Sequence, residues 1–398
     1  MTEWMMDIRA MRRTVARYAL GAMPLAMAAS PGLLSAQSGM PSVARRDTII
    51  TEPTRAPRTP LATAEATRRL KRFSFIAYGD TRGRADGTAL QVEHGRVVAS
   101  MLETIKAAEG TKNPIRFVLQ SGDAVVNGSI ATQLNVSYIP LINRLTQEGN
   151  VPYLLSVGNH DVGTSMELTD TRRRDGLHNF FTTNRELLPP VGPQRLAGYP
   201  TYVFGYGNTF FVAFDSNIPD DTVQFAWVSR QLDQLDRRRY RNIVVFYHHP
   251  AYSSGPHGGP TLEPQAMSVR ARWMPLFRKH HVRLLLTGHE HFYEHFVERY
   301  RDGSGAHRMD QVVSGGGGAP LYPYRGMPDL TAYKAAAGDA AVQVEQVVRP
   351  ASEGKDNVYH YVVVHVEGER ITLEVIGVDA GASYAPYNGT RRTTLTPR

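Results

Sequence analysis

The chain has 398 residues, 42% of them hydrophobic, which is enough for one large or two ordinary folded domains and excludes disorder throughout. Its formal net charge of +8 is spread over scattered arginines, so it suits an anionic substrate and only weakly favours nucleic acid as a partner. The absence of cysteine excludes disulfides, thiolate metal ligands and a cysteine nucleophile, and leaves nitrogen and oxygen atoms to hold any metal.

Residues 1–36 have the pattern of a signal peptide. Arginines precede the small and apolar stretch YALGAMPLAMAASPGLLSA, whose glycines and prolines disfavour a stable membrane span. Residues 37–71 are rich in Pro, Thr and Arg and lack periodicity, so we expect a flexible leader there. The folded domain is predicted over residues 72–380, with a C-terminal tail at 381–398. These features predict a periplasmic or secreted protein, by either the Sec or the twin-arginine route.

From residue 73 onward, apolar runs of strand length alternate with helical patterns, which is typical of an α/β protein. Gly207-Asn208 lies between two β-rich runs and predicts a hairpin. The last runs are expected to close a second sheet, with a turn at Glu367-Gly368, and residues 321–357 are expected to form a long excursion or lid. The runs that predict strands, with the polar residues that end them, are 73–80, 115–123, 151–161, 201–216, 242–249, 282–291, 310–318 and 358–379, and the helical patterns are 94–108, 133–145, 223–235 and 270–280.

Polar side chains follow five of these strands. In isolation each is open to an ordinary explanation: an Asp caps a helix or forms a turn, and a His is satisfied in the core. The ends of neighbouring strands in such sheets converge on one crevice, however, so the combination predicts a site. His289 and His291 are expected to alternate along an extended backbone with both rings on one side. The residues are Asp80, Asp123, Asn159-His160-Asp161, His248-His249 and His289-Glu290-His291.

The order Gly-Asp, Gly-Asp, Gly-Asn-His-Asp, His-x-Pro and Gly-His-x-His resembles the calcineurin-like metallophosphoesterases, which include the purple acid phosphatases, over residues 73–379. The resemblance implies a two-sheet α/β sandwich in four αββα layers, with two metal ions (Mn, Fe or Zn) at the strand ends. It also implies hydrolysis of a phosphomonoester or phosphodiester by metal-bound hydroxide.

The resemblance also assigns roles to residues of this chain. Asp123 resembles the bridging carboxylate, and His160 would contact the phosphate or the leaving group, with Asp161 orienting it. The ligands of one metal would be Asn159, His248 and His289, and those of the other Asp80 and His291.

One position departs from the family pattern. The family usually begins Asp-x-His, whereas Arg82 follows Asp80 and Thr81 here, and a guanidinium cannot bind a cation. We therefore predict that Arg82 clamps a substrate phosphate, the alternative being an ion pair with Asp80. His94 is the predicted replacement ligand, the alternative being a surface or capping residue.

The loop after His248 offers further candidates. His249 and His257 lie on it, and each is predicted either to contact substrate or to face solvent. Two other functions stay open at this point: a non-catalytic phosphate- or ligand-binding protein on the same fold, and a nuclease, which the positive charge would suit. The expected partner is a small phosphoester.

Overall fold

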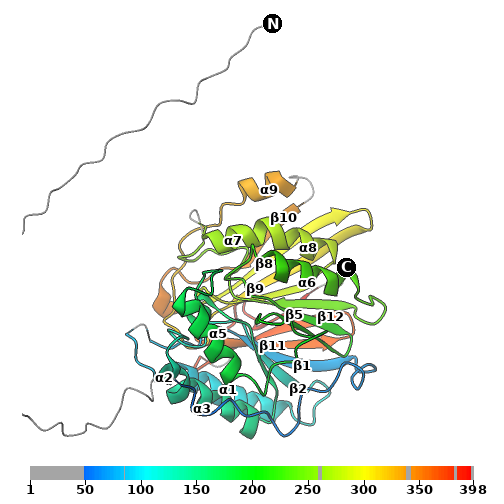
Figure 1. Ribbon diagram of the computed structural model, residues 1–398. Coiled ribbons are helices and arrows are strands. Elements are labelled where there is room, and N and C mark those ends of the chain that lie inside the picture. The colour runs from blue at the N-terminus through cyan, green and yellow to red at the C-terminus, as the bar shows by residue number, and fades with distance from the viewer. Residues whose placement is uncertain (1–48, 85, 259–261, 338–341, 381–382, 396–398) are drawn as a thin grey trace, which may run out of the picture. The chain divides into compact units, whose positions relative to one another are not determined.

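The computed structural model describes residues 49–84, 86–258, 262–337, 342–380 and 383–395; the predicted signal peptide lies outside them. Two β-sheets lie face to face, and helices cover an outer face of each, giving four layers (Figure 1). The α/β sandwich expected from the sequence is therefore confirmed. In the described part of the chain, every helix is too short or too polar to span a membrane.

The first sheet has the strand order β13-β12-β11-β1-β2-β3. Its centre is parallel, because α1 returns the chain from β1 to β2, and α2 and α3 return it from β2 to β3. β11 pairs antiparallel with the other side of β1. The elements are β1 (Arg72–Tyr78), α1 (Val92–Ala108), β2 (Ile115–Gln120), α2 (Ala131–Gln133), α3 (Ile139–Asn143), β3 (Tyr153–Leu155), β11 (His360–Glu367), β12 (Arg370–Gly377) and β13 (Arg392–Leu395).

The second sheet has the order β10-β8-β9-β7-β6-β5-β4. β5, β6, β7 and β9 run parallel, and the predicted hairpin turns between β4 and β5 at Gly207, whose φ of 57° suits glycine. The elements are β4 (Tyr202–Tyr206), β5 (Thr209–Ala213), α6 (Thr222–Asp233), β6 (Asn242–Phe246), α7 (Pro264–Ser268), α8 (Met274–Lys279), β7 (Leu284–Thr287), β8 (Tyr293–Asp302), β9 (Gly305–Ser314) and β10 (Val342–Val348).

Three apolar layers hold the elements together. Aromatic rings fill the space between the sheets, as where Phe75 stacks on Phe117 with centroids 5.2 Å apart. One outer layer packs α1 on the first sheet, and the other packs Trp273 of the segment before α8 on Phe214 of the second. Because both sheets are packed on two faces, the strand ends are held in fixed positions.

Four features differ from the predicted organisation. β11 and β12 join the first sheet beside β1, and only β9 of the predicted C-terminal strands lies in the second. The 321–357 segment contains α9 (Thr331–Ala337) and the edge strand β10, and the predicted tail supplies β13. Local patterns could not reveal these pairings, because antiparallel partners far apart in sequence are selected by tertiary packing.

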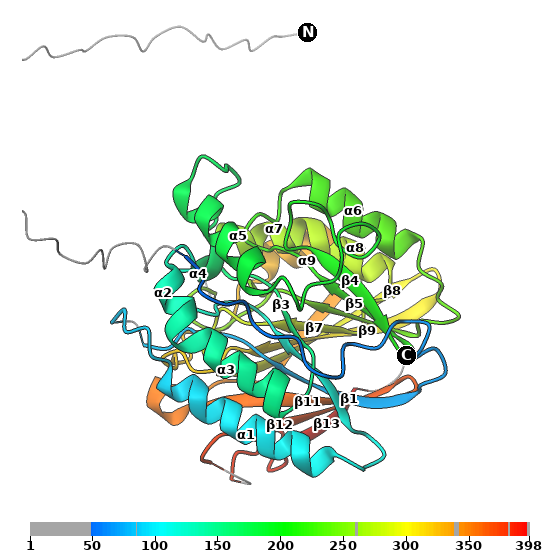
Figure 2. The ribbon, with the colours of Figure 1, turned by 60° about the horizontal axis from the view of Figure 1, so that its bottom comes forward.

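The fourth difference concerns the predicted leader. Residues 49–71 are bound to the domain: Thr54 N donates to Thr183 O at 2.8 Å, and Arg55 N donates to the Asn143 side chain at 2.8 Å. Figure 2 shows this segment in blue, running from beside α2 to the start of β1. Its backbone is anchored by hydrogen bonds to a backbone carbonyl and to side chains of the domain, and such bonds produce no periodicity in the sequence.

Candidate metal centre

The five predicted strand ends meet at one edge of the sandwich. Asp80, Asp123 and Asn159 follow β1, β2 and β3, and His248 and His289 follow β6 and β7, all of them parallel strands. The loops are tightly packed, since a Cβ on Gly158 would lie 2.1 Å from Oδ1 of Asp123. Only glycine therefore fits beside that carboxylate.

Three of the acidic or imidazole residues have a strained backbone. Asp80, Asp123 and His289 have φ values of 58°, 55° and 72°, in the left-handed region that residues with a side chain rarely adopt. The extended backbone expected through His289 and His291 is therefore absent at His289, although both rings still face the site. Such strain gathers where a side chain must be aimed at a functional centre.

Donor atoms converge on Nε2 of His248. Asn159 Oδ1 lies 3.0 Å from it, His289 Nδ1 3.1 Å and Asp123 Oδ1 3.3 Å. Burial lowers the pKa of His248 to about 4, so the ring is neutral at physiological pH. Its Nδ1 lies 2.9 Å from the Ser121 carbonyl, which can only accept, so Nδ1 holds the single proton. Nε2 thus presents a lone pair to the carboxylate and amide oxygens.

His291 repeats this arrangement on the other side. Its Nδ1 donates to the Pro320 carbonyl at 2.6 Å, and its Nε2 lies 3.5 Å from Oδ1 of Asp80. Ligand atoms of Asp80, Asp123 and His291 all lie within 4.8 Å of one another. Burial, and then the charge of Asp123, raise the pKa of Asp80, while burial and the Arg82 charge lower that of His291. A histidine lone pair that faces two neighbouring carboxyl groups is an arrangement that suits a metal cation.

Residues predicted as ligands of the two metals thus form two adjacent groups. Asn159, His289 and Oδ1 of Asp123 lie around Nε2 of His248, and ligand atoms of Asp80, His291 and the same Asp123 lie within 4.8 Å of one another. The carboxylate, amide and imidazole donors fit Mn, Fe or Zn, and the tautomers of His248 and His291 are fixed by backbone carbonyls.

Glu263 is a site residue that the sequence reading missed. One of its oxygens lies 2.8 Å from Nε2 of His289, whose Nδ1 faces His248, and the other lies 2.5 Å from Nδ1 of His257. Hydrogen bonds from these two histidines lower the pKa of Glu263 below its ordinary value, even though burial opposes this. An acidic residue in the histidine-bearing loop after β6 was the available signal for it.

The two other histidines of that loop lie beside His289. The His249 ring centroid is 4.5 Å from that of His289, and its Nδ1 lies 3.0 Å from Oγ of Ser216. The His257 ring centroid is 4.3 Å from that of His289, and about a third of the His257 side chain is exposed (32%). His257 is therefore accessible to a substrate, whereas His249 is buried.

His160 lies at the site, but Asp161 does not orient it, contrary to the prediction. His160 Nδ1 donates to the Val126 carbonyl at 2.7 Å, and Nε2 lies 3.9 Å from Oδ2 of Asp123. Asp161 instead accepts backbone N–H groups of Asp123, Ala124 and Gly158 at 2.8–2.9 Å. Its carboxyl, whose pKa is raised to about 7 by burial and then by Asp123, ties together the two loops that hold the ligands.

Arg82 points into the centre from the loop after β1. Its Nε lies 3.9 Å from Oδ2 of Asp123, and Nη2 donates to the Tyr322 hydroxyl at 3.4 Å. The side chain is 7% exposed, and Nε is buried without a hydrogen-bond partner. The Tyr322 ring stacks on that of His291 at 3.9 Å. Among the described residues, the alternative ion pair with Asp80 is not formed.

His94 does not reach the metal ligands. Its Nδ1 lies 2.8 Å from Oε1 of Gln91, and its Nε2 lies 3.1 Å from the Tyr78 hydroxyl. The candidate metal-holding groups of the described residues do not include it. Both ring nitrogens are occupied in a buried polar network, so the geometry gives no support to the prediction that His94 completes the metal shell. It is not a surface residue either, because the side chain is fully buried.

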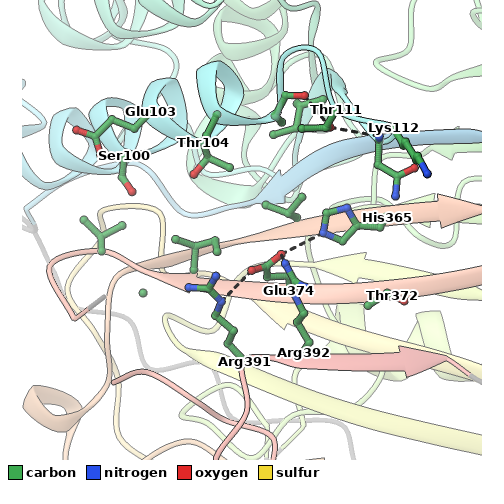
Figure 3. A pocket seen from close by; sticks show the side chains of 18 of the residues that line it. Ser100, Glu103, Thr104, Thr111, Lys112, His365, Thr372, Glu374, Arg391 and Arg392 are labelled. Carbon is green, nitrogen blue, oxygen red and sulfur yellow. Dashed lines mark hydrogen bonds and ion pairs between the residues drawn. The ribbon is translucent and has the colours of Figure 1, made fainter. Parts of the chain in front are cut away.

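A separate cavity lies on the outer face of the first sheet, away from these residues. It has a volume of about 1250 Å³ and lies between α1 and β11–β13 (Figure 3). Its charged side chains pair with one another, as where Arg391, Arg392 and His365 all contact Glu374. None of the predicted site residues lines it.

Comparison with known proteins gives a matching family model and solved structures of similar fold. The calcineurin-like phosphoesterase family model matches residues 75–293. A purple acid phosphatase from yellow lupin (Lupinus luteus) seeds has a TM-score of 0.58 and 17% identity, over 85% of this chain and 55% of that one. GAP50, the anchor in the inner membrane complex of Plasmodium, has a TM-score of 0.52 and 14% identity, over 82% and 89%. The chain spans about half the length of the lupin protein, and these identities establish the fold alone.

Proposed function

The chain belongs to the calcineurin-like phosphoesterase family. From this premise we propose that it is an exported, metal-dependent phosphohydrolase with a dinuclear centre that hydrolyses small phosphomonoesters or phosphodiesters. The observation that carries the dinuclear proposal is that Nε2 of His248 faces the Asp123 carboxylate, while Nε2 of His291 faces the neighbouring Asp80 carboxylate.

We assign the residues as follows. Asp123 would bridge the two ions, one shared with Asp80 and His291, and the other with Asn159, His248 and His289. When bound, two such ions neutralise the oxygens of a phosphoester and lower the pKa of a water between them. Glu263 holds the His289 ring so that Nδ1 faces the centre, since the Glu263 carboxylate accepts a hydrogen bond from Nε2–H of His289.

Arg82 is assigned to bind the phosphate. A buried guanidinium Nε without a hydrogen-bond partner is costly, and a substrate oxygen would satisfy it. The Tyr322 hydroxyl accepts from Nη2, and Nε lies 3.9 Å from Oδ2 of Asp123, so the guanidinium is held beside that carboxylate. Arg82 then opposes the repulsion between substrate and carboxylates without displacing a ligand.

His160 is assigned to the leaving group. Its Nδ1 proton is held by the Val126 carbonyl, so Nε2 is the atom free to gain or release a proton. The side chain is 28% exposed, which permits contact with a bound ester. Protonated Nε2 would give its proton to the departing alkoxide oxygen.

The location of the positive charge gives no support to a nuclease. Residues 65–72, 236–241 and 367–370 contain nine basic and four acidic side chains. They lie together, because Gly368 N donates to Lys71 O at 2.8 Å and the Asn242 side chain donates to Gly368 O at 2.8 Å. This basic edge lies at the starts of β1 and β6, whereas the metal centre lies at their ends. A nucleic-acid track would be expected beside the centre.

The proposal of export rests on the composition of residues 1–36, and N-terminal sequencing of protein recovered outside the cytoplasm tests it. The proposal of catalysis is tested by hydrolysis of an aryl phosphate and an aryl phosphodiester, before and after chelation of metal. Chelator-sensitive turnover that returns with Mn, Fe or Zn supports the enzyme. Bound phosphate without turnover would instead indicate the non-catalytic alternative.

A further inference from the structure

A second cluster of metal-ligating side chains lies at the other end of the second sheet. His281 precedes β7, Asp302 ends β8 and His307 lies in β9. Nε2 of His281 lies 2.8 Å from Oδ2 of Asp302, and Nε2 of His307 lies 2.8 Å from Oδ1. The ligand atoms of all three lie within 4.8 Å of one another. This cluster has no part in the proposed reaction, since β7 separates His281 from His289.

We propose that His281, Asp302 and His307 form a second, independent metal site that takes one Zn²⁺ or a similar borderline divalent ion. Two imidazoles and a carboxylate are the donor set that such ions select. The rings are stacked, with centroids 4.0 Å apart and planes 13° apart, which places both Nε2 atoms side by side facing one carboxylate. Oγ of Ser304 lies 3.0 Å from Nε2 of His307 and donates to Oδ1 of Asp302, which helps to orient that carboxylate.

The backbone at His281 is a further observation in favour of the site. His281 has a φ of 52°, directly after α8, at a position where helices usually end on glycine. A side chain there costs conformational energy, so this position would by itself favour glycine over histidine. Its ring is thereby turned toward the β8–β9 hairpin rather than away from it.

Metal binding would require each ring to hold its proton on Nδ1 instead of Nε2. Nδ1 of His307 is buried and makes no hydrogen bond among the described residues, so this tautomer has a cost there. We therefore expect the site to bind its ion more weakly than the main centre. An ion held there would tie the turn before β7 to the β8–β9 hairpin.

Zinc stoichiometry tests the site without relying on activity. Protein equilibrated with Zn²⁺ and desalted should carry one more ion per chain than His281→Ala or Asp302→Asn, and aryl phosphate hydrolysis should be unchanged in both. His365→Ala is the matched control, since His365 has a similar exposure (22% against 23%) and pairs with one carboxylate, Glu374, without a second imidazole. It should keep the full zinc content.

Equal zinc content in wild type and both variants would overturn the proposal and leave a hydrogen-bonded His–Asp–His cluster. Circular dichroism identifies a variant that fails to fold. If His281→Ala does so, the zinc content of Asp302→Asn tests the proposal, because asparagine keeps the shape of the aspartate side chain. A thermal shift on adding Zn²⁺ to wild type that is absent in Asp302→Asn would support the site independently. A defect confined to the main centre would lower activity in all proteins alike and leave the zinc difference intact.

Discussion

Nε of Arg82 lies 3.9 Å from Oδ2 of Asp123 and donates no hydrogen bond within the described part of the chain. A guanidinium that served only to neutralise the carboxylates would lie in hydrogen-bond contact with one of them. Because Nε has no acceptor among the described residues, a phosphate oxygen could take that place, which is the basis of the proposed substrate role of Arg82.

Arg82→Ala should therefore keep its metal and bind phosphate more weakly. The loss of a charge-assisted hydrogen bond corresponds to about 1.5–3 kcal/mol, or roughly 10- to 150-fold in the inhibition constant of inorganic phosphate. Arg82→Lys keeps the positive charge but not the forked guanidinium, so its inhibition constant for phosphate should lie between those of wild type and Arg82→Ala. Loss of metal with unchanged phosphate affinity per metal-loaded site would show that Arg82 supports the ligands instead.

Asp123→Asn should abolish hydrolysis and lower the bound metal, because the neutral amide would replace the carboxylate that is proposed to bind both ions. His289→Ala should do the same through loss of one direct ligand. Asp310→Asn is a control for removing a buried carboxylate elsewhere, since Asp310 pairs with His295 and Arg308 between the strands. Full activity in Asp123→Asn would contradict the assignment of the centre.

His160→Ala should retain its metal and lose turnover by roughly 100-fold, the size of an acid–base contribution. The loss should be smaller for an ester with a good leaving group such as a nitrophenolate, because that group departs without a proton. Comparison of an alkyl and an aryl ester measures this difference. Metal loss in His160→Ala would make the residue a ligand.

Glu263→Gln should weaken metal binding by roughly 10- to 100-fold, because the carboxylate that accepts from Nε2 of His289 loses its charge. Chelator competition measures the change. Glu345→Gln is the control, since Glu345 forms an exposed pair with Arg299. Equal metal affinity in Glu263→Gln and Glu345→Gln would contradict the proposal that Glu263 supports the metal ligand His289.

The lowered pKa of buried His94 leads to a prediction of how the free energy of unfolding depends on pH. Burial lowers its pKa to about 3, whereas the unfolded chain has the ordinary value near 6.5. Between these values only the unfolded state takes up the proton, so the free energy of unfolding falls as pH falls from about 6.5 toward 3. At pH 4.5 the loss is about 2–3 kcal/mol per histidine of this kind.

Urea denaturation of chelator-treated protein at pH 7.5 and pH 4.5 measures this loss. His94→Gln should show a smaller pH dependence than wild type by about one histidine's share, while buried His360, whose pKa is about 4, continues to contribute. The metal content of His94→Gln should equal that of wild type. Loss of one metal from His94→Gln would restore the role first predicted for it.

Much of the centre could be predicted from the sequence because its ligands follow strands directly. The positions of Asp80, Asp123 and His248 can be predicted once a strand and its C-terminal end are recognised. Glu263 and the Val126 carbonyl could not be found this way, since one lies in an irregular loop and the other is a backbone atom brought to His160 by packing. The sheet membership of β11 and β12 was wrong for the same reason: strand patterns do not identify partners.

The most direct test of the dinuclear proposal is a titration of metal-free protein with Mn, Fe or Zn, with bound ions and aryl phosphate hydrolysis measured on the same samples. His281→Ala is the background to use, because it removes the second proposed site. Hydrolysis should be absent without metal and reach its plateau at two bound ions per chain. Full turnover by metal-free protein, or none at two bound ions, would contradict the account.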